Sequence, residues 1–117
     1  MQQDGKLDYL EMPGGNLPAT KAFYARAFGW GFTDYGPEYA SFTEGLDGGF
    51  YADPKEAALA PLPVLFATDL EATVAKVEAA GAVITRPIFA FPGGRRFHFR
   101  DPAGNELAVW GDPTDPS

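Results

Sequence analysis

The chain has no cysteine and only one histidine, and these absences remove much of the chemistry available to a small protein. Without cysteine it can form no disulfide, thiol nucleophile, iron–sulfur cluster or cysteine-ligated zinc site. Its apolar runs are short and broken by proline, glycine or aspartate, so we expect no association with a membrane. The first six residues lack the basic start and apolar middle of a signal peptide, and we expect a cytoplasmic protein.

Basic residues are also scarce. Lys and Arg number 9 against 16 Asp and Glu, which gives a formal net charge of −7. An acidic chain without a basic run is a poor binder of nucleic acid. Aromatic residues are plentiful by contrast, with 10 Phe, 5 Tyr and 2 Trp. This surplus predicts an aromatic-lined cleft in addition to a hydrophobic core.

Two predicted helices look like copies of one another. One begins at the N-cap Asn16 and stops at Gly29, and the other begins at the N-cap Asp69 and stops at Gly81. The two caps are 69 − 16 = 53 positions apart, and a leucine follows each of them. Turn signals divide the remaining chain into extended segments at residues 7–12, 31–35, 39–43, 49–52, 62–68, 82–86, 88–91, 95–100 and 106–110, of which 88–91 is the weakest.

The sequence therefore predicts a strand, a helix and three strands, repeated once. At 117 residues we expect one α+β domain of two βαβββ modules. The first module covers about residues 6–53, a proline-containing linker covers 54–61, the second module covers about 62–111, and 112–117 form a frayed tail. A ferredoxin-like sandwich dimer also repeats strands and helices, but three strands after each helix argue against it.

Alternation along the first strand assigns its two faces. Leu10 and Met12 form an apolar set that should pack on a helix. Tyr9 and Glu11 should therefore point to the opposite side of the sheet.

The last two strands are predicted to form a hairpin through a loop at residues 101–105. This loop places His98 opposite Ala108 and Arg96 opposite Trp110, and residues directly opposite share a face. The same register collects four apolar residues on the other, core-facing side: Phe97, Phe99, Leu107 and Val109.

Five stretches carry a family resemblance: YLEM at residues 9–12, NLPATKAFY at 16–24, FGW at 28–30, FATDL at 66–70 and FRDPAGNEL at 99–107. Together they resemble the vicinal oxygen chelate (VOC) superfamily of glyoxalases, bleomycin-resistance proteins and extradiol dioxygenases, over roughly residues 6–111. The resemblance implies paired βαβββ modules whose eight strands curl around an open cup, commonly in a homodimer.

Metal-dependent members of that superfamily hold a divalent ion at four positions with histidine, glutamine and acidic residues. The resemblance places these positions on Tyr9, Leu62, Ala108 and, in a glycine-rich stretch, Phe50. Leucine and alanine cannot bind a metal, and neutral tyrosine or phenylalanine is a poor ligand. We therefore expect no metal ion and no other cofactor.

The predicted cup lining is aromatic with a few polar groups, which is typical of a small-molecule site. It comprises Tyr9, Glu11, Phe50, Leu62, Val64, Phe66, Arg96, His98, Ala108 and Trp110. Glu11 and His98 are the candidate acid–base pair, because histidine titrates near neutral pH. Two structural alternatives stay open: Glu11 pairs with Arg96 or His98, and His98 serves the fold alone.

Three functions remain open at this point. The leading hypothesis is a metal-independent protein that binds a small aromatic or amphipathic organic molecule in its cup, as a homodimer. The second is an enzyme, either an isomerase or lyase that uses Glu11 and His98 or a metal-dependent lyase or dioxygenase with atypical ligands. The third is a regulatory or interaction module whose cup is filled by side chains.

Overall fold

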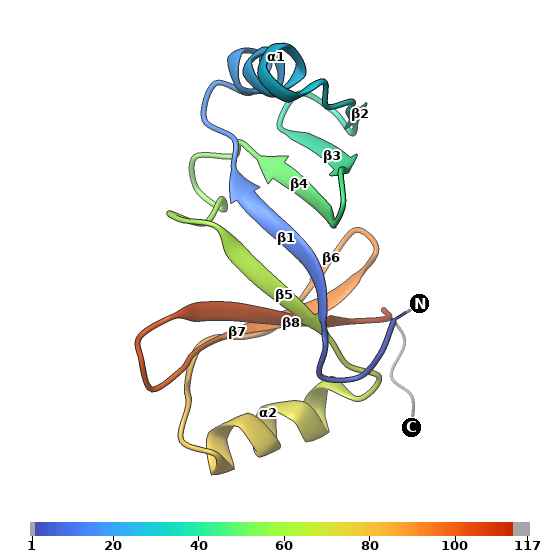
Figure 1. The fold of residues 1–117 in the computed structure, drawn as a ribbon. Helices are drawn as coiled ribbons and strands as arrows, with labels where there is room; N and C mark the ends of the chain where they lie inside the picture. Colours follow the sequence, from blue (N-terminus) through green and yellow to red (C-terminus); the bar gives the residue numbers. More distant parts are fainter. Residues whose placement is uncertain (1, 114–117) are drawn as a thin grey trace. The chain divides into compact units, whose positions relative to one another are not determined.

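The computed structural model describes residues 2–113, and these contain two helices and eight strands (Figure 1). By its contacts the chain divides into two compact parts. We call Tyr9–Leu62 the N-terminal module, and Met1–Asp8 together with Pro63–Ser117 the C-terminal module. Of the predicted tail, residues 114–117 lie outside the described part of the chain.

The N-terminal module has the predicted order of one strand, one helix and three strands. Its elements are β1 (Leu7–Pro13, which begins in the other module), α1 (Leu17–Phe28), β2 (Thr33–Asp34), β3 (Tyr39–Thr43) and β4 (Asp47–Tyr51). The strands lie in the order β2-β3-β4-β1, in which β1 and β4 are parallel and the other pairs antiparallel. In a βαβββ unit the first strand pairs in parallel with the last strand, and β1 and β4 do so here.

The C-terminal module repeats this architecture. Its elements are β5 (Leu62–Phe66, whose first residue belongs to the other module), α2 (Leu70–Ala79), β6 (Val83–Phe91), β7 (Gly94–Arg100) and β8 (Glu106–Gly111). The strand order is β5-β8-β7-β6, again with the first and last strands parallel. The predicted fold class, α+β with two βαβββ modules, is confirmed.

The two helices begin with the same capping geometry, as the repeat predicts. The side chain of Asn16 accepts the Ala19 backbone N–H at 3.1 Å, and the side chain of Asp69 accepts the Ala72 backbone N–H at 3.0 Å. Each bond satisfies a donor that has no partner within its helix. α1 ends at Gly29, whose φ of +74° lies in the left-handed region that favours glycine.

The core of the N-terminal module lies between α1 and its strands. Its buried residues are Leu17, Ala40, Phe42 and Phe50, with Met12, Tyr24, Trp30, Phe32 and Ala52 packed around them. The prediction that Phe50 lines a ligand site is therefore wrong. In the observed register Phe50 lies opposite both Met12 and Ala40, so it points toward the helix, whereas Gly49 shares the face of Glu11.

The core of the C-terminal module lies between α2 and β7–β8. The hairpin register is confirmed at every predicted pair, including His98 with Ala108 and Arg96 with Trp110. Phe97, Phe99 and Val109 are buried together with Ala67 and Leu70, and Leu65, Val74, Val77, Ala82, Ile84, Ile88 and Leu107 pack against them. Arg96, His98, Ala108 and Trp110 therefore lie on the sheet face that points away from α2.

The strand β6 departs from the prediction of two separate strands at 82–86 and 88–91. It is one strand over Val83–Phe91, and its pairing with β7 shifts register between Ile84 and Arg86 and again between Arg86 and Phe89. Pro87 lies within this stretch and has no backbone N–H to donate. The strand therefore continues past the proline with an irregular ladder and does not break.

Candidate functional site

Six of the predicted site residues share the face of the C-terminal module that points away from α2. Arg96 and His98 on β7 lie opposite Trp110 and Ala108 on β8. On the next strand, Val64 and Phe66 of β5 pair with Ala108 and Trp110 in turn. The structure thus brings together Val64, Phe66, Arg96, His98, Ala108 and Trp110. We call these residues, together with the neighbouring Asp8, Arg86, Phe89 and Glu106, the His98 face.

His98 is the chemically distinctive residue on this face. Its side chain is almost fully buried, with 6% of its surface exposed. The Nδ1 atom lies 3.0 Å from Oε2 of Glu106, two positions from Ala108 along β8. The Nε2 atom is buried and has no hydrogen-bond partner among residues 2–113. Most buried polar atoms have a hydrogen-bond partner, so this unsatisfied nitrogen is an exception among the described residues.

Two arginines and a phenylalanine surround His98 on the same face. Arg86 of β6 lies directly opposite His98 across the strands. Its Cζ atom lies 3.7 Å from the centre of the Phe89 ring, and Cζ of Arg96 lies 5.6 Å from that centre. The Phe89 and His98 rings are 5.7 Å apart. The imidazole therefore lies beside an aromatic ring on which cationic groups stack.

The charge state of His98 follows from its surroundings. Burial lowers the pKa of the imidazole, and the positive charges of Arg96 and Arg86 lower it further. The hydrogen bond to Glu106 raises this pKa, but burial is the larger effect and the pKa lies below its ordinary value. The ring is therefore neutral at pH 7, and one of its two nitrogens carries a lone pair.

This lowered pKa predicts a specific pH dependence of stability. Between the folded and the ordinary pKa of histidine, the unfolded chain binds more protons at His98 than the folded chain does. The free energy of unfolding should therefore fall as the pH is lowered through that range. Urea denaturation of the chain and of His98→Gln, at about pH 7.5 and about pH 5, checks this. The same pH dependence in both proteins would contradict it.

The side chain of Trp110 on the His98 face is held by several contacts. Its indole Nε1–H donates to Oδ2 of Asp8 at 2.9 Å, and its ring meets the Phe66 ring edge-on at 5.3 Å. Gly94 permits this arrangement, because a Cβ there would lie only 3.2 Å from Cε3 of Trp110. The tryptophan is therefore fixed in position by a hydrogen bond and by close packing.

Adjacent arginines on β7 point to opposite sides, as strand alternation requires. Arg95 lies on the α2 side, where its Nη1 atom is 2.7 Å from Oε2 of Glu71. This bond lowers the pKa of the Glu71 carboxyl. Of the two, Arg96 reaches the His98 face.

The other predicted site residues belong to the N-terminal module. The hydroxyl of Tyr9 is hydrogen-bonded to that of Tyr39. Burial raises the pKa of Tyr9, and the Glu11 carboxylate adds to this effect. A Cβ on Gly49 would lie 2.6 Å or less from both hydroxyl oxygens, so the glycine makes room for the two phenols. Glu11 and Leu62 are buried, with 4% and 2% of their surfaces exposed, and the pairing of Glu11 with His98 stays a prediction.

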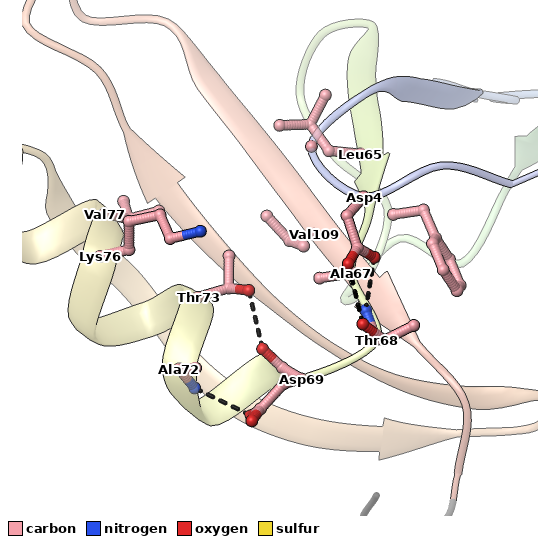
Figure 2. A pocket seen from close by; sticks show the side chains of 12 residues that line it. Asp4, Leu65, Ala67, Thr68, Asp69, Ala72, Thr73, Lys76, Val77 and Val109 are labelled. Atoms are coloured by element: carbon pink, nitrogen blue, oxygen red, sulfur yellow. Dashed lines mark hydrogen bonds between the residues drawn. The ribbon is translucent and has the colours of Figure 1, made fainter.

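A hollow of about 310 Å³ in the C-terminal module lies beside the first turns of α2, and Phe66 is the one residue of the His98 face among those that line it (Figure 2). Several of the polar groups that line it already form hydrogen bonds within the chain. Asp4 accepts both the backbone N–H and the hydroxyl of Thr68 at 2.9 Å, and the Thr73 hydroxyl donates to the Asp69 carbonyl at 2.7 Å. These bonds hold the N-terminal segment beside α2, and we assign the hollow no ligand.

A second hollow, of about 230 Å³, lies in the N-terminal module between β2 and β3. Phe32, Ser41, Phe42 and Glu44 are among the residues that line it. It includes none of the predicted site residues.

Within residues 2–113, no three histidine, aspartate or glutamate side chains gather closely enough to hold a metal ion. The described part of the chain also contains no helix with the length and apolar character to cross a membrane.

Sequence reasoning missed four members of the His98 face. Glu106 could have been found, because the predicted register already placed it on this face, two residues from Ala108. Arg86 and Phe89 could not, since the shifts along β6 hide which residues lie opposite His98. Asp8 reaches Trp110 across 102 positions of sequence, and no local pattern indicates that contact.

The paired βαβββ modules define the class of protein before any comparison is made, and comparison then gives the family. Residues 6–109 match the Glyoxalase/Bleomycin resistance protein/Dioxygenase superfamily. The chain belongs to this superfamily. A search of curated proteins finds no match.

Solved structures of the same fold accompany the family match. One is described as an NAD-dependent benzaldehyde dehydrogenase from Legionella pneumophila, with a TM-score of 0.74 and 15% identity over 89% of this chain and 97% of that one. Methylmalonyl-CoA epimerase from Mycobacterium tuberculosis gives a TM-score of 0.68 and 12% identity over 96% and 91%. The Mn(II)-bound glyoxalase from Novosphingobium aromaticivorans gives 0.63 and 24% identity over all of this chain but only 44% of that one. At these identities the likeness shows the fold alone.

Proposed function

We propose that this protein binds a small aromatic or amphipathic organic molecule at the His98 face, without a metal ion. The observation that carries the proposal is the buried Nε2 atom of His98, which has no hydrogen-bond partner within the described part of the chain. A buried polar atom left without a hydrogen bond costs about 1–3 kcal/mol, and a ligand group at this point removes that cost.

The side chains around His98 fit such a molecule. Phe66, Phe89 and Trp110 supply ring surface, and Arg86, Arg96 and His98 supply a few polar groups. A predominantly apolar lining with a few fixed polar atoms is the usual composition of a small-molecule site. Superfamily membership supports the same class of function.

The chemistry of the side chains supports metal independence. The family positions for ligands carry Tyr9, Leu62, Ala108 and Phe50. Ala108 is completely buried against its neighbours and Phe50 packs in the core under α1. An open-site metal needs about three protein ligands of the histidine or carboxylate type, and these positions supply none.

NMR provides the test, because the chain has two tryptophans in different surroundings. Trp110 belongs to the His98 face, whereas Trp30 packs in the core of the N-terminal module. Titration of the chain with benzoate, benzamide and indole should shift the Trp110 indole N–H signal and leave that of Trp30 in place. The outcome that contradicts the proposal is a Trp110 signal that none of the three compounds moves.

The metal part of the proposal is tested separately. The chain is dialysed against a chelator, its metal content is measured by elemental analysis, and the titration is repeated. Binding should survive unchanged. Stoichiometric metal that the chelator removes, together with loss of the Trp110 shift, would overturn metal independence.

A second candidate function is acid–base catalysis by an isomerase or lyase. It is favoured by the hydrogen bond between His98 and Glu106, because a carboxylate on one imidazole nitrogen orients the other as a base. Glu11 is the proposed partner of His98. Glu11→Gln should then abolish turnover while the circular dichroism spectrum stays that of the folded chain.

The assembly and location of the protein are parts of the same proposal. We infer a single domain, supported by a family match that spans both modules, and a homodimer in the cytoplasm. Phe23 and Phe28 of α1 have 55% and 65% of their surfaces exposed, which leaves apolar area for a second copy. Sedimentation equilibrium measures the mass of the assembly directly.

A further inference from the structure

The hydrogen bond between His98 and Glu106 determines which imidazole nitrogen carries the proton. Nδ1 lies 3.0 Å from a carboxylate oxygen, and an ionised carboxylate can only accept. In a neutral ring Nδ1 must therefore hold the hydrogen, and Nε2 must hold the lone pair. The buried Nε2 atom, to which the described residues offer no partner, is thus an acceptor and a base.

A group that complements this atom must bring a proton of its own. A carboxylate or carbonyl oxygen has none, and would face the lone pair of Nε2 without a bond. A neutral hydroxyl satisfies Nε2 directly. The aromatic surroundings of the imidazole suit a hydroxyl that is attached to a planar, conjugated skeleton.

The charges around His98 favour a hydroxyl that ionises. Arg86 and Arg96 place two positive groups on the same face, and both stack on Phe89. Glu106 adds a negative charge on the Nδ1 side of the ring, which stabilises an imidazolium. A proton that moves from the ligand to Nε2 would leave an oxyanion next to the imidazolium and near two guanidinium groups.

The most irregular strand of the module lies against His98. Arg86 and Phe89 of β6 lie against His98, and the pairing of β6 with β7 shifts register on both sides of Arg86. Irregular strand pairing is frequent beside functional sites, since it aims side chains out of the regular pattern. A ligand that reaches Nε2 must displace part of this stretch, which also contributes Ile84 and Ile88 to the core.

On this basis, and resting on the proposed function, we propose that the His98 face takes an aromatic or enolic hydroxyl compound and binds it as the oxyanion. The ligand's O–H bond breaks, its proton goes to Nε2 of His98, and its electron pair stays on the oxygen. Glu106 is the positioning residue that keeps Nε2 unprotonated beforehand. Arg86 and Arg96 stabilise the negative charge afterwards.

The probe for this proposal is 4-nitrophenol, because its visible absorbance reports whether it is ionised. It is added to the full chain at a pH slightly below that of its own ionisation. The phenolate band should appear on binding. The comparison compound 4-nitroanisole has the same ring but no hydroxyl hydrogen, and it should bind about tenfold more weakly or worse.

Variants connect the signal to the named residues. His98→Gln and Arg96→Gln should each weaken 4-nitrophenol binding by about tenfold or more. Arg95→Gln is the matched control, because its side chain points to the α2 side and contacts Glu71, and it should bind the probe as the unchanged chain does. Glu106→Gln should shrink the phenolate band, since an amide can donate to Nδ1 and so leave the proton on Nε2.

The single histidine makes the proton itself observable. Long-range ¹H–¹⁵N spectra should show Nδ1 protonated and Nε2 unprotonated in the free chain, and both protonated with 4-nitrophenol bound. A merely structural role for Glu106 would not change these signals in Glu106→Gln. The proposal would be overturned if the imidazole proton of His98 were on Nε2 in the ligand-free chain.

The remaining outcomes separate this proposal from the proposed function. If 4-nitrophenol and 4-nitroanisole bind equally well and the bound phenol stays neutral, the hydroxyl specificity is wrong and small-molecule binding stands. The hydroxyl specificity is equally wrong if benzoate, benzamide or indole moves the Trp110 signal but neither nitro compound does. If no compound moves the Trp110 signal in a folded chain, both proposals fail.

Discussion

Replacing Gly94 by alanine is expected to lower the free energy of unfolding by about 3 kcal/mol, the upper part of the range for overpacked sites. A Cβ at this position would lie 2.4 Å from the backbone carbonyl oxygen of Gly111 and 3.2 Å from the Trp110 ring. Because the closer atom is backbone, relief requires β7 and β8 to separate at this end. Urea denaturation measures the loss of stability, and the Trp110 indole signal reports the distortion of the His98 face.

The control for this substitution is Gly31→Ala. Gly31 has no positive φ, and a Cβ there would meet no atom of the described residues within 4 Å. Its stability should stay within about 0.5 kcal/mol of the unchanged chain. Equal stabilities for the two variants would mean that β7 and β8 are farther apart at Gly94 than these distances require.

Replacing Phe97 by alanine is expected to cost about 4 kcal/mol of stability, a large part of the total for a domain of this size. Phe97 is completely buried between the sheet of the C-terminal module and α2, in contact with the core that contains Leu70 and Val109. Truncation removes its apolar contacts and leaves a cavity that β7, paired on both sides, cannot close. Thermal and urea denaturation measure the effect.

Two further variants locate the cause of that loss. Phe97→Leu keeps most of the volume and should cost only about 1 kcal/mol. Leu59→Ala removes an apolar side chain that is fully exposed, and should change nothing measurable. A small effect for Phe97→Ala would show that this core is loosely packed.

The fold was predictable from the sequence because its signals are local. Asn16 and Asp69 are followed by helical patterns and Gly29 ends the first of them, so the caps alone locate both helices. The hairpin register followed from one loop length and from the requirement that Phe97 and Val109 share a face. In each case a short segment of chain contains the whole physical constraint.

The faces of the candidate site residues could be predicted only where strand registers were regular. His98, Arg96 and Trp110 were placed on the correct face because β7 and β8 pair without a bulge. Phe50 was misplaced because a run of glycines gives no apolar alternation from which its face can be assigned. Arg86 was missed because the irregular pairing of β6 is decided by tertiary contacts and by Pro87, which a pattern of single residues does not encode.

The N-terminal segment shows that the structural modules do not coincide with consecutive stretches of sequence. Asp4 bonds to Thr68 and Asp8 bonds to Trp110, so residues before and at the start of β1 complete the C-terminal module. A chain cut in the linker at residues 54–61 would separate that module from two of its own carboxylates. Circular permutation offers the contiguous version: a polypeptide that starts at Pro63 and carries residues 2–8 after its last strand would keep both of these bonds within a single continuous half. The chain therefore passes from one unit to the other at two places, inside β1 between Asp8 and Tyr9 and at the start of β5 between Leu62 and Pro63.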